Sequence, residues 1–315
     1  FTSIEKSALD IPVWKDPEIL ALAKELFKYG ATVALIAESG FNLYSLIVDG
    51  FDYMHAEPGF PESGKPTHNG SPVLFPWPNR IAGAQFTWDG VDYELPRNEA
   101  ATGCSIHGYA VASPWQIIDS GPGHVTGEYT VEGGWPTRGR LRMTYRVEPA
   151  ALITTCEVEN LDDRDFPFGL GFHPYLRVPG PFDQWVLQVD AGQFWPLANM
   201  VPTGPPQPVS ADLDFRKPKR IGDQHLDDVL TGLSPADGLA RRAGLHSMAS
   251  SITVSSDPGF REYVVFTNAS RDAVAIEPYT CATDAVHLQQ RGIDAGWRVL
   301  EPGASQTFSW RIDIA

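Results

Sequence analysis

Short runs of alternating apolar and polar residues, separated by turns, dominate this sequence and limit the folds open to it. In residues 151–159, the even positions from Leu152 to Val158 are mostly apolar, and the odd positions from Ile153 to Glu159 include two glutamates. Side chains of a strand point alternately to its two faces, so this pattern predicts a half-buried strand. The 29 glycines and 27 prolines supply turns for many such strands.

The other runs lead to the same architecture. Asp89-Gly90 between residues 85–88 and 91–95 is typical of a two-residue β-hairpin turn. Regular short strands of this kind predict an all-β fold, a large antiparallel β-sandwich. The remaining predicted strands are 32–36, 43–48, 125–131, 139–147, 262–267, 273–277 and 305–313.

A helix is predicted only near the beginning of the sequence. Asp16 can cap it, Pro17 suits its first turn, and Gly30 ends it, which gives a helix over 17–29. We therefore expect a helical N-terminal extension.

The domain organisation follows from these elements. We expect residues 1–30 to form the extension and residues 31–315 to form a single β-sandwich domain. The Pro- and Gly-rich stretches 57–72 and 196–209 are predicted to be long surface loops, because no change of composition accompanies them.

Charge and cysteine content exclude several classes of function. A net charge of −15 without a basic stripe argues against nucleic acid and favours a neutral small molecule. No run approaches 18 apolar residues, so no membrane span is predicted. Cys104, Cys156 and Cys281 form neither a disulfide framework nor a zinc pattern, which indicates reduced thiols in a cytoplasmic protein.

Two residues are candidates for acid–base chemistry. His173 lies in Gly171-Phe172-His173-Pro174-Tyr175, and imidazole can exchange a proton near neutral pH. Glu277 ends the apolar run 273–276, where a carboxylate is costly unless it is paired or used. The alternatives are a packed core histidine and a glutamate turned toward water.

Polar residues elsewhere are candidates for binding a hydroxylated ligand. Arg80 offers a planar fork of donors, which suits two ligand oxygens or a structural ion pair with a carboxylate. Asn79 beside it both donates and accepts. His107 is either a buried structural histidine or a hydrogen-bond partner of a ligand. Asp227 can accept hydrogen bonds from hydroxyl groups or can be a solvated loop residue. The ring of Tyr175 can pack on an apolar ligand face or in the core.

The sequence contains no pattern for a cofactor. The eight histidines show no metal-ligand spacing, and there is no phosphate loop, dinucleotide fingerprint or Gly-x-Ser-x-Gly elbow. We therefore predict neither metal nor cofactor, and chemistry limited to acid and base catalysis.

Taken in order, these segments resemble the aldose 1-epimerase (galactose mutarotase-like) family from about residue 30 onward. The resemblance implies the supersandwich form of the antiparallel β-sandwich, with a sugar site in a cleft across one sheet. The strand 262–267 departs from galactose-specific members, which often carry a glutamine there. The segments that carry the resemblance are Asn79-Arg80-Ile81, the Gly90 hairpin, Ile106-His107-Gly108, Phe172-His173-Pro174-Tyr175, Leu226-Asp227-Asp228, Glu277-Pro278 and Asp284-Ala285.

The resemblance also implies roles for the candidate residues. Glu277 matches the catalytic base and His173 the catalytic acid of a reaction that opens and closes the sugar ring and so exchanges the α and β anomers. The implied ligand is a free monosaccharide, and the protein is expected to be a monomer or a homodimer. The substrate-binding positions are then Asn79, Arg80, His107, Tyr175 and Asp227.

Three other functions remain open at this stage. A hexose-6-phosphate mutarotase would use the same pair, with Arg97 and Arg177 as candidates for the phosphate. A glycosidase would need two carboxylates, for which Glu277 and Asp227 are the candidate pair. A non-catalytic sugar-binding protein on the same fold would keep the site without turnover.

Overall fold

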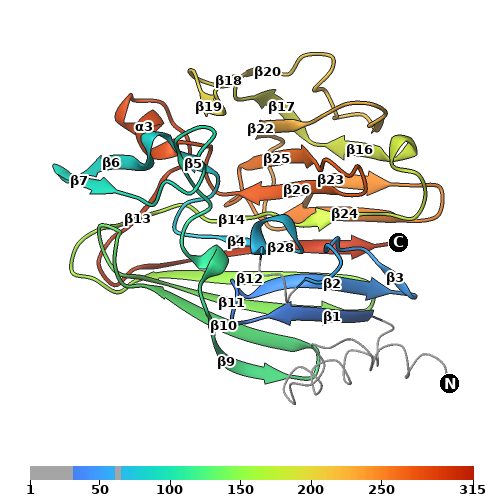
Figure 1. Ribbon diagram of the computed structural model, residues 1–315, viewed down its shortest axis with the longest axis horizontal. Helices are drawn as coiled ribbons and strands as arrows, with labels where there is room; N and C mark the ends of the chain where they lie inside the picture. The colour runs from blue at the N-terminus through green and yellow to red at the C-terminus, as the bar shows by residue number, and fades with distance from the viewer. Residues whose placement is uncertain (1–30, 61–64) are drawn as a thin grey trace.

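Two large antiparallel sheets organise the chain in the computed structural model, which describes residues 31–60 and 65–315 (Figure 1). The predicted helix over 17–29 lies outside the described residues. The first sheet has nine strands, in the order β21 (Lys219–Arg220), β16 (Val186–Val189), β23 (Ala240–His246), β24 (Ser251–Ser256), β28 (Ser305–Ile314), β12 (Ala151–Asn160), β11 (Gly139–Glu148), β10 (His124–Val131) and β9 (Gln116–Gly121).

The second sheet carries the candidate chemistry. Two short strands, β14 (Gly171–Phe172) and β15 (Tyr175–Leu176), pair with β26 (Val274–Tyr279) along the same edge. Apart from β15, the strand order is β20 (Gln207–Pro208), β17 (Ala191–Phe194), β22 (Asp227–Leu233), β25 (Glu262–Thr267), β26, β14 and β4 (Val73–Leu74).

Smaller elements join and cover these sheets. The predicted hairpin is present as β6 (Gln85–Trp88) and β7 (Val91–Glu94). The other small sheets are β1 (Ala31–Ile36), β2 (Asn42–Val48) and β3 (Phe51–Asp52); β5 (Arg80–Ile81) with β8 (Ser105–Ile106); β13 (Phe166–Phe168) with β27 (Arg298–Leu300); and β18 (Leu197–Ala198) with β19 (Val201–Pro202). The helical segments are η3 (Pro66–His68), η4 (Ala82–Ala84), η5 (Ala110–Ala112), η6 (Phe182–Gln184) and α3 (Ala285–Gln290).

The predicted alternation in β12 is confirmed. Leu152, Thr154, Cys156 and Val158 are buried, whereas Thr155 is exposed. This strand pairs along its length with β11 and β28, and neighbouring β11 shows the same alternation of buried and less buried residues. Period-2 patterning therefore selected the correct buried face.

Aromatic side chains pack the two large sheets against each other. The ring of Phe172 in β14 lies 5.1 Å from that of Trp310 in β28. Tyr263 of β25 donates its hydroxyl hydrogen to Ser256 of β24 over 2.8 Å. These contacts define the inner face of the second sheet and confirm the expected all-β sandwich.

The two stretches predicted to be surface loops are more ordered than expected. Within 57–72, Asn69 and Ser71 are buried, and Asn42 donates hydrogen bonds to the carbonyls of Pro66 and Asn69. The stretch 196–209 contains β18, β19 and β20, and β20 pairs with the second sheet. The loop prediction was wrong for these parts because backbone pairing and buried amides leave little trace in composition.

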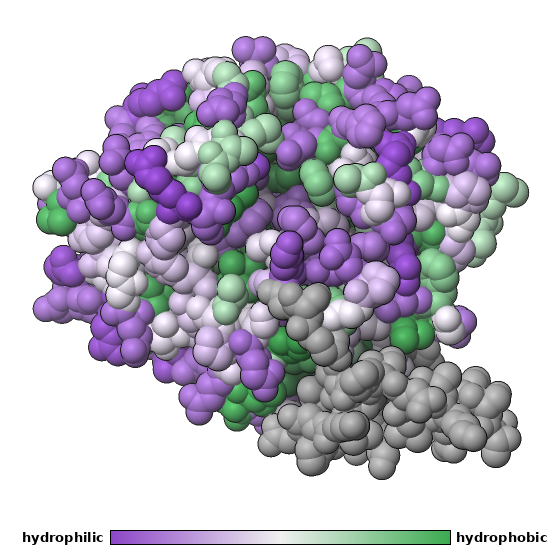
Figure 2. Space-filling view, in the orientation of Figure 1, coloured by the Kyte–Doolittle hydropathy of each residue, from purple (hydrophilic) through white to green (hydrophobic). Residues whose placement is uncertain are grey.

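The hydrophilic surface and the absence of disulfide bonds among the three cysteines agree with the composition. Hydrophilic residues cover most of the face shown in Figure 2, with hydrophobic residues scattered among them. Cys104, Cys156 and Cys281 are free and buried. Within residues 31–60 and 65–315, no helix is long and apolar enough to cross a membrane.

We predict that Trp310→Ala lowers the free energy of unfolding by about 3–5 kcal/mol, because it removes a large side chain between the sheets that is 1% exposed. Urea denaturation followed by circular dichroism measures this change. The matched control is Met248→Ala, at a fully exposed position, which should change stability by less than about 0.5 kcal/mol. Equal stabilities of the two variants would contradict the packing described here.

Candidate functional site

Strand β26 holds Glu277 at the outer face of the second sheet. Val264 of β25 lies opposite Glu277, and Tyr263 of β25 faces the other sheet, so Val264 and Glu277 point away from the inner core. All six residues of β26 are nevertheless buried, and Glu277 is 1% exposed. The predicted carboxylate is therefore enclosed and does not turn toward water.

The register of the short strands brings His173 opposite Glu277. On one side of His173, Gly171 of β14 pairs with Tyr279; on the other, Tyr175 of β15 pairs with Ala275. His173 falls midway between these pairs, on the same face as Glu277. Gly171 is needed here, because a Cβ atom at this position would lie 2.4 Å from the ring of Tyr279.

The two side chains meet closely. His173 Nε2 lies 3.2 Å from Glu277 Oε1, and Tyr279 donates a short hydrogen bond to the other carboxyl oxygen, Oε2. The ring of Tyr175 stacks on the imidazole of His173 with centroids 4.5 Å apart. Glu277 and His173 are therefore held in fixed orientations by two tyrosines.

Burial controls the protonation of this pair. It raises the pKa of Glu277 well above its usual range, although the Tyr279 hydrogen bond opposes the shift. Burial likewise lowers the pKa of His173 to about 3. Between these two values the pair holds one proton, and burial favours the neutral form with that proton on Glu277.

Strands β5 and β8 bring Arg80 and His107 to the same place. Arg80 pairs with Ile106, and His107 directly follows β8. The His107 amide donates to the carbonyl of Asn79 over 2.9 Å. Asn79 and His107 have φ values of 52° and 72°, a left-handed conformation that side chains rarely adopt. The backbone is thus bent on both sides of this small sheet.

His107 is buried beside His173. Their ring centroids are 5.6 Å apart in an edge-to-face arrangement. Burial, with smaller effects from His173 and Arg80, lowers the pKa of His107 well below its usual value, which leaves a neutral imidazole. The following Gly108 has φ 69°, and a Cβ atom there would lie 2.3 Å from the Phe75 carbonyl oxygen, so only glycine fits.

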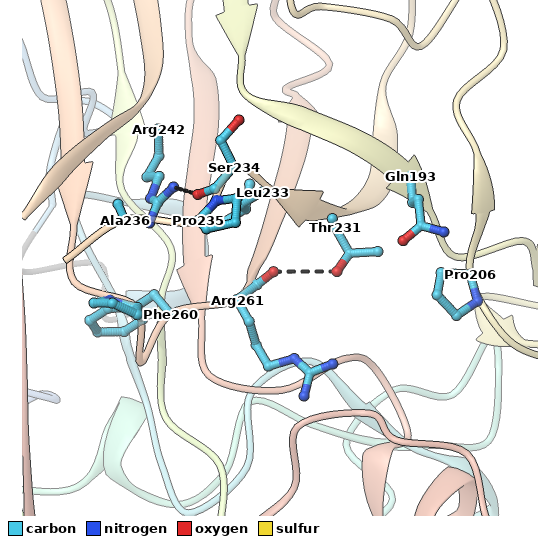
Figure 3. Close-up of a pocket in the computed structure, with 12 residues that line it drawn as sticks. Gln193, Pro206, Thr231, Leu233, Ser234, Pro235, Ala236, Arg242, Phe260 and Arg261 are labelled. Carbon is cyan, nitrogen blue, oxygen red and sulfur yellow. Dashed lines mark hydrogen bonds between the residues drawn. The ribbon is translucent and has the colours of Figure 1, made fainter. Parts of the chain in front are cut away.

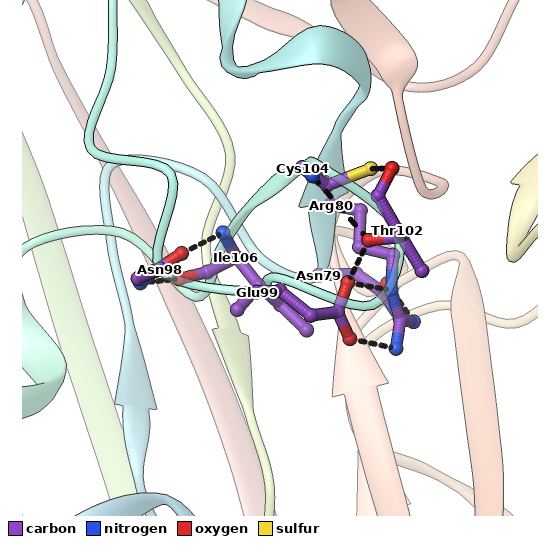
Figure 4. A network of polar contacts seen from close by, with 7 residues as sticks. All are labelled: Asn79, Arg80, Asn98, Glu99, Thr102, Cys104 and Ile106. Carbon is purple, nitrogen blue, oxygen red and sulfur yellow. Dashed lines mark hydrogen bonds and ion pairs between the residues drawn. The ribbon is translucent and has the colours of Figure 1, made fainter.

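Arg80 makes a bidentate ion pair with Glu99, a partner that the sequence did not indicate. Its Nε and one terminal nitrogen lie 2.7 and 2.6 Å from the two carboxyl oxygens of Glu99 (Figure 4). The other terminal nitrogen donates to Asn79 Oδ1 over 3.1 Å. Arg80 therefore does form a structural ion pair, and the rest of its guanidinium is left for a ligand.

Asp227 and Tyr175 border this cluster. Asp227 lies opposite Phe266 of β25, whose ring approaches both His173 and Tyr175. The Asp227 carboxylate is exposed, yet surrounding protein raises its pKa while the charge of Arg80 opposes the shift. Tyr175 is buried, and its hydroxyl donates to the Thr67 carbonyl over 3.1 Å, which holds the ring beside His173.

Two buried ring nitrogens of this cluster, His173 Nδ1 and His107 Nδ1, have no hydrogen-bond partner. Glu277 Oε1 makes no hydrogen bond either and has only its ion-pair contact with His173 Nε2. Leaving buried polar atoms unpaired costs about 1–3 kcal/mol each, so such a group indicates a place for a hydroxylated ligand. Among the described residues, no group of three or more His, Cys, Asp or Glu side chains is arranged to hold a metal ion.

Sequence reasoning missed some residues of this arrangement as site members. Tyr279 stands two positions after Glu277 in a strand, and period 2 predicts that both face the same side. Glu99 lies in an irregular segment with no periodic signal. Glu262, at the start of β25, is fully buried, and no local pattern in the sequence indicates this.

A pocket of about 400 Å³ lies further along β22 and β17 (Figure 3). Thr231 donates to the carbonyl of Arg261 over 3.3 Å, and Arg242 donates to that of Ser234 over 2.6 Å. None of the predicted site residues lines this pocket. Arg261 connects it to Glu262, whose Oε1 lies 3.3 Å from the Arg261 Nε.

Glu262 gives a prediction about stability. Burial raises its pKa to about 7, although Thr231, Trp195 and Arg261 favour the charged form. The pKa of Glu262 is higher in the folded than in the unfolded chain, so binding of a proton by Glu262 stabilises the folded state. This contribution is fully present below about pH 4.5 and is lost as the pH rises to about 7. As the pH rises across this window, the free energy of unfolding of Glu262→Gln should increase by about 3 kcal/mol relative to that of the natural protein.

Urea unfolding of both proteins at several pH values measures this difference. Glu301→Gln, at an exposed position, is the matched control and should show no such trend. A constant difference between Glu262→Gln and the natural protein across the window would contradict the raised pKa.

Solved structures share this fold. A galactose mutarotase-like protein from Clostridium acetobutylicum superposes with a TM-score of 0.80 at 19% identity, covering 91% of this chain and 93% of that one. An aldose epimerase homologue from C. elegans gives a TM-score of 0.78 at 18% identity, covering 91% and 96%. At such identities the similarity establishes the fold alone.

Sequence relatives extend the comparison. The uncharacterized protein YihR of Escherichia coli K12 is 28% identical over 243 residues, 75% of this chain and 77% of that protein. Galactose mutarotase of Rattus norvegicus is 28% identical over 161 residues, 47% of this chain and 45% of that enzyme. The family model for aldose 1-epimerase matches residues 28–313. This match spans nearly the whole chain, and the protein therefore belongs to the aldose 1-epimerase family.

Proposed function

We propose that this protein is a mutarotase that interconverts the α and β anomers of a free, neutral aldose. The observation that carries this proposal is the pair of His173 and Glu277, 3.2 Å apart, beside the buried His173 Nδ1 and His107 Nδ1 atoms, which make no hydrogen bond within the protein. Anomeric exchange needs a proton removed from one oxygen and added to another on the same carbon. An acid and a base that are close neighbours suit two such oxygens.

The reaction starts from the ion-pair form of the one-proton pair. This form arises when a proton moves from Glu277 to His173. The Tyr279 hydrogen bond and the charge of Arg80 stabilise the resulting Glu277 carboxylate. Glu277 then takes the proton of the anomeric hydroxyl while His173 protonates the ring oxygen. The C1–O5 bond breaks to give the open aldehyde, and both side chains are left in their neutral forms.

Ring closure reverses these transfers. Rotation about C1–C2 presents the other face of the carbonyl to the ring oxygen. His173 takes back the proton of that oxygen as it attacks, and Glu277 returns one to the new anomeric hydroxyl. Arg80 and His107 are assigned to the charge that develops on the oxygens, with Asn79 and Asp227 as further sugar-binding residues.

The alternatives find less support. Arg177, one candidate for a phosphate, donates from its Nε to the Asp52 carbonyl over 2.7 Å and lies over the ring of Phe51. A glycosidase needs a second carboxylate about 5–9.5 Å away as its main partner, whereas the immediate partner of Glu277 is an imidazole.

A cytoplasmic location also remains a prediction.

We predict that Glu277→Gln and His173→Asn each lower the rate of mutarotation by a factor of about 10²–10⁴, because each removes one proton-transfer group. Polarimetry of freshly dissolved α-D-glucose and α-D-galactose measures the rate. Glu301→Gln and His124→Asn are controls of the same chemistry outside the cluster.

The outcomes separate the candidate functions. Acceleration that persists in Glu277→Gln would overturn the assignment of this pair. Absence of acceleration by the natural protein, with sugar affinity retained in Glu277→Gln, would favour a non-catalytic sugar-binding protein.

The protonation of the pair gives a separate prediction. Because the pKa of His173 is lowered to about 3 and that of Glu277 is raised well above 4.5, the one-proton state persists between these values. We expect kcat/KM to hold its value on the acid side down to about pH 3, below the usual pKa of a glutamate, and to fall on the alkaline side when the remaining proton is lost. A fall on the acid side that is already centred near pH 4.5 would contradict this.

A further inference from the structure

The ion pair between Arg80 and Glu99 occupies one edge of the guanidinium that the site presents (Figure 4). The Arg80 side chain is 12% exposed and that of Glu99 21% exposed, so solvent screens this pair little. Two parallel hydrogen bonds fix the plane of the guanidinium as well as its position.

Glu99 is itself held in place. The hydroxyl of Thr102 donates a short hydrogen bond to Glu99 Oε2, and the amide of Gly103 donates to the Glu99 carbonyl over 3.0 Å. Burial alone would raise the pKa of Glu99, but the hydrogen bonds from Arg80 and Thr102 outweigh it and lower that pKa. The carboxylate is therefore charged at neutral pH.

Part of the Arg80 guanidinium is not engaged by these protein groups. A guanidinium has five N–H donors; Glu99 takes two and Asn79 takes one, which leaves two. Arg80 also interacts electrostatically with Asp227 and Tyr279, which border the Glu277 cluster. Two donors of fixed direction thus remain for a ligand, while the positive charge of Arg80 is already matched.

We propose that Glu99 is a positioning and specificity-determining residue, which orients Arg80 toward the sugar and cancels its charge so that the site selects neutral over anionic sugars. This inference rests on the proposed function of the same site. Recognition of a phosphate group generally uses a cation free to pair with it. With Arg80 matched by Glu99 and Asp227 adding a negative charge, the cluster repels such a group.

Glu99→Gln tests this inference, because glutamine keeps the shape and one acceptor oxygen but removes the charge. We expect inorganic phosphate, followed by isothermal titration calorimetry, to bind Glu99→Gln about tenfold more tightly than the natural protein. The double variant Glu99→Gln/Arg80→Met should lose this gain. With glucose, kcat/KM should fall about tenfold in Glu99→Gln, mainly through kcat, as expected for a group that orients Arg80 in the transition state.

Glu94→Gln is the matched control, since Glu94 is an exposed glutamate on the nearby strand β7. If Glu99→Gln does not fold, Thr102→Val replaces it, because it loosens Glu99 without touching Arg80; the same changes are then expected at smaller size. Unchanged phosphate affinity together with unchanged kcat/KM would overturn the inference. Tighter phosphate binding by a protein that accelerates no mutarotation would instead refute the proposed function and leave the role of Glu99 standing.

Discussion

The enclosure of strand β26 on both faces is the constraint on which the rest of the site depends. Val274 and Ile276 pack into the core between the sheets, whereas Glu277 and Tyr279 lie on the outer face and are equally buried. A carboxylate in such surroundings is costly unless neighbours compensate it. The compensation comes from segments far apart in the chain: the Tyr279 hydroxyl, the His173 imidazole and the charge of Arg80. Folding the sheet therefore also assembles the group of residues that gives the pair its unusual protonation.

Bent backbone holds the second half of the site against this sheet. Asn79, His107 and Asp284 all have φ between 52° and 72°, a conformation that costs of order 1–3 kcal/mol for such residues. Hydrogen bonds fix each bend: His107 donates to the Asn79 carbonyl, and Asp284 donates its amide to the Arg80 carbonyl and accepts from the Ala82 amide. Because Asp284 follows Glu277 closely in the chain, these bonds connect the arginine to the strand that carries the glutamate. The bends lower local stability and fix the positions of Arg80 and His107.

Much of the fold could be predicted from the sequence, and the arrangement of the site only in part. Alternation in residues 151–159 and the Asp89-Gly90 turn are local signals, and the structure confirms both. The closeness of His173 and Glu277 depends on the register of strands about a hundred residues apart, which no local pattern encodes; only resemblance suggested it. Glu99 and the buried Glu262 were missed because burial of a charged side chain follows from packing by other segments. Polar residues are the hardest to place since their environment decides their role.

The position of β28 in the middle of the nine-stranded sheet has a consequence for biosynthesis. This strand lies between β24 and β12, and its partner residues in β12 precede it by about 150 positions. While a ribosome is still making residues 298–304, the strands β9 to β12 can pair among themselves, but β12 then presents an unpaired edge. Such an edge can add strands from another nascent chain, and non-local pairing of this kind is slow. Shielding of that edge during translation is therefore expected to govern how much folded protein a cell obtains.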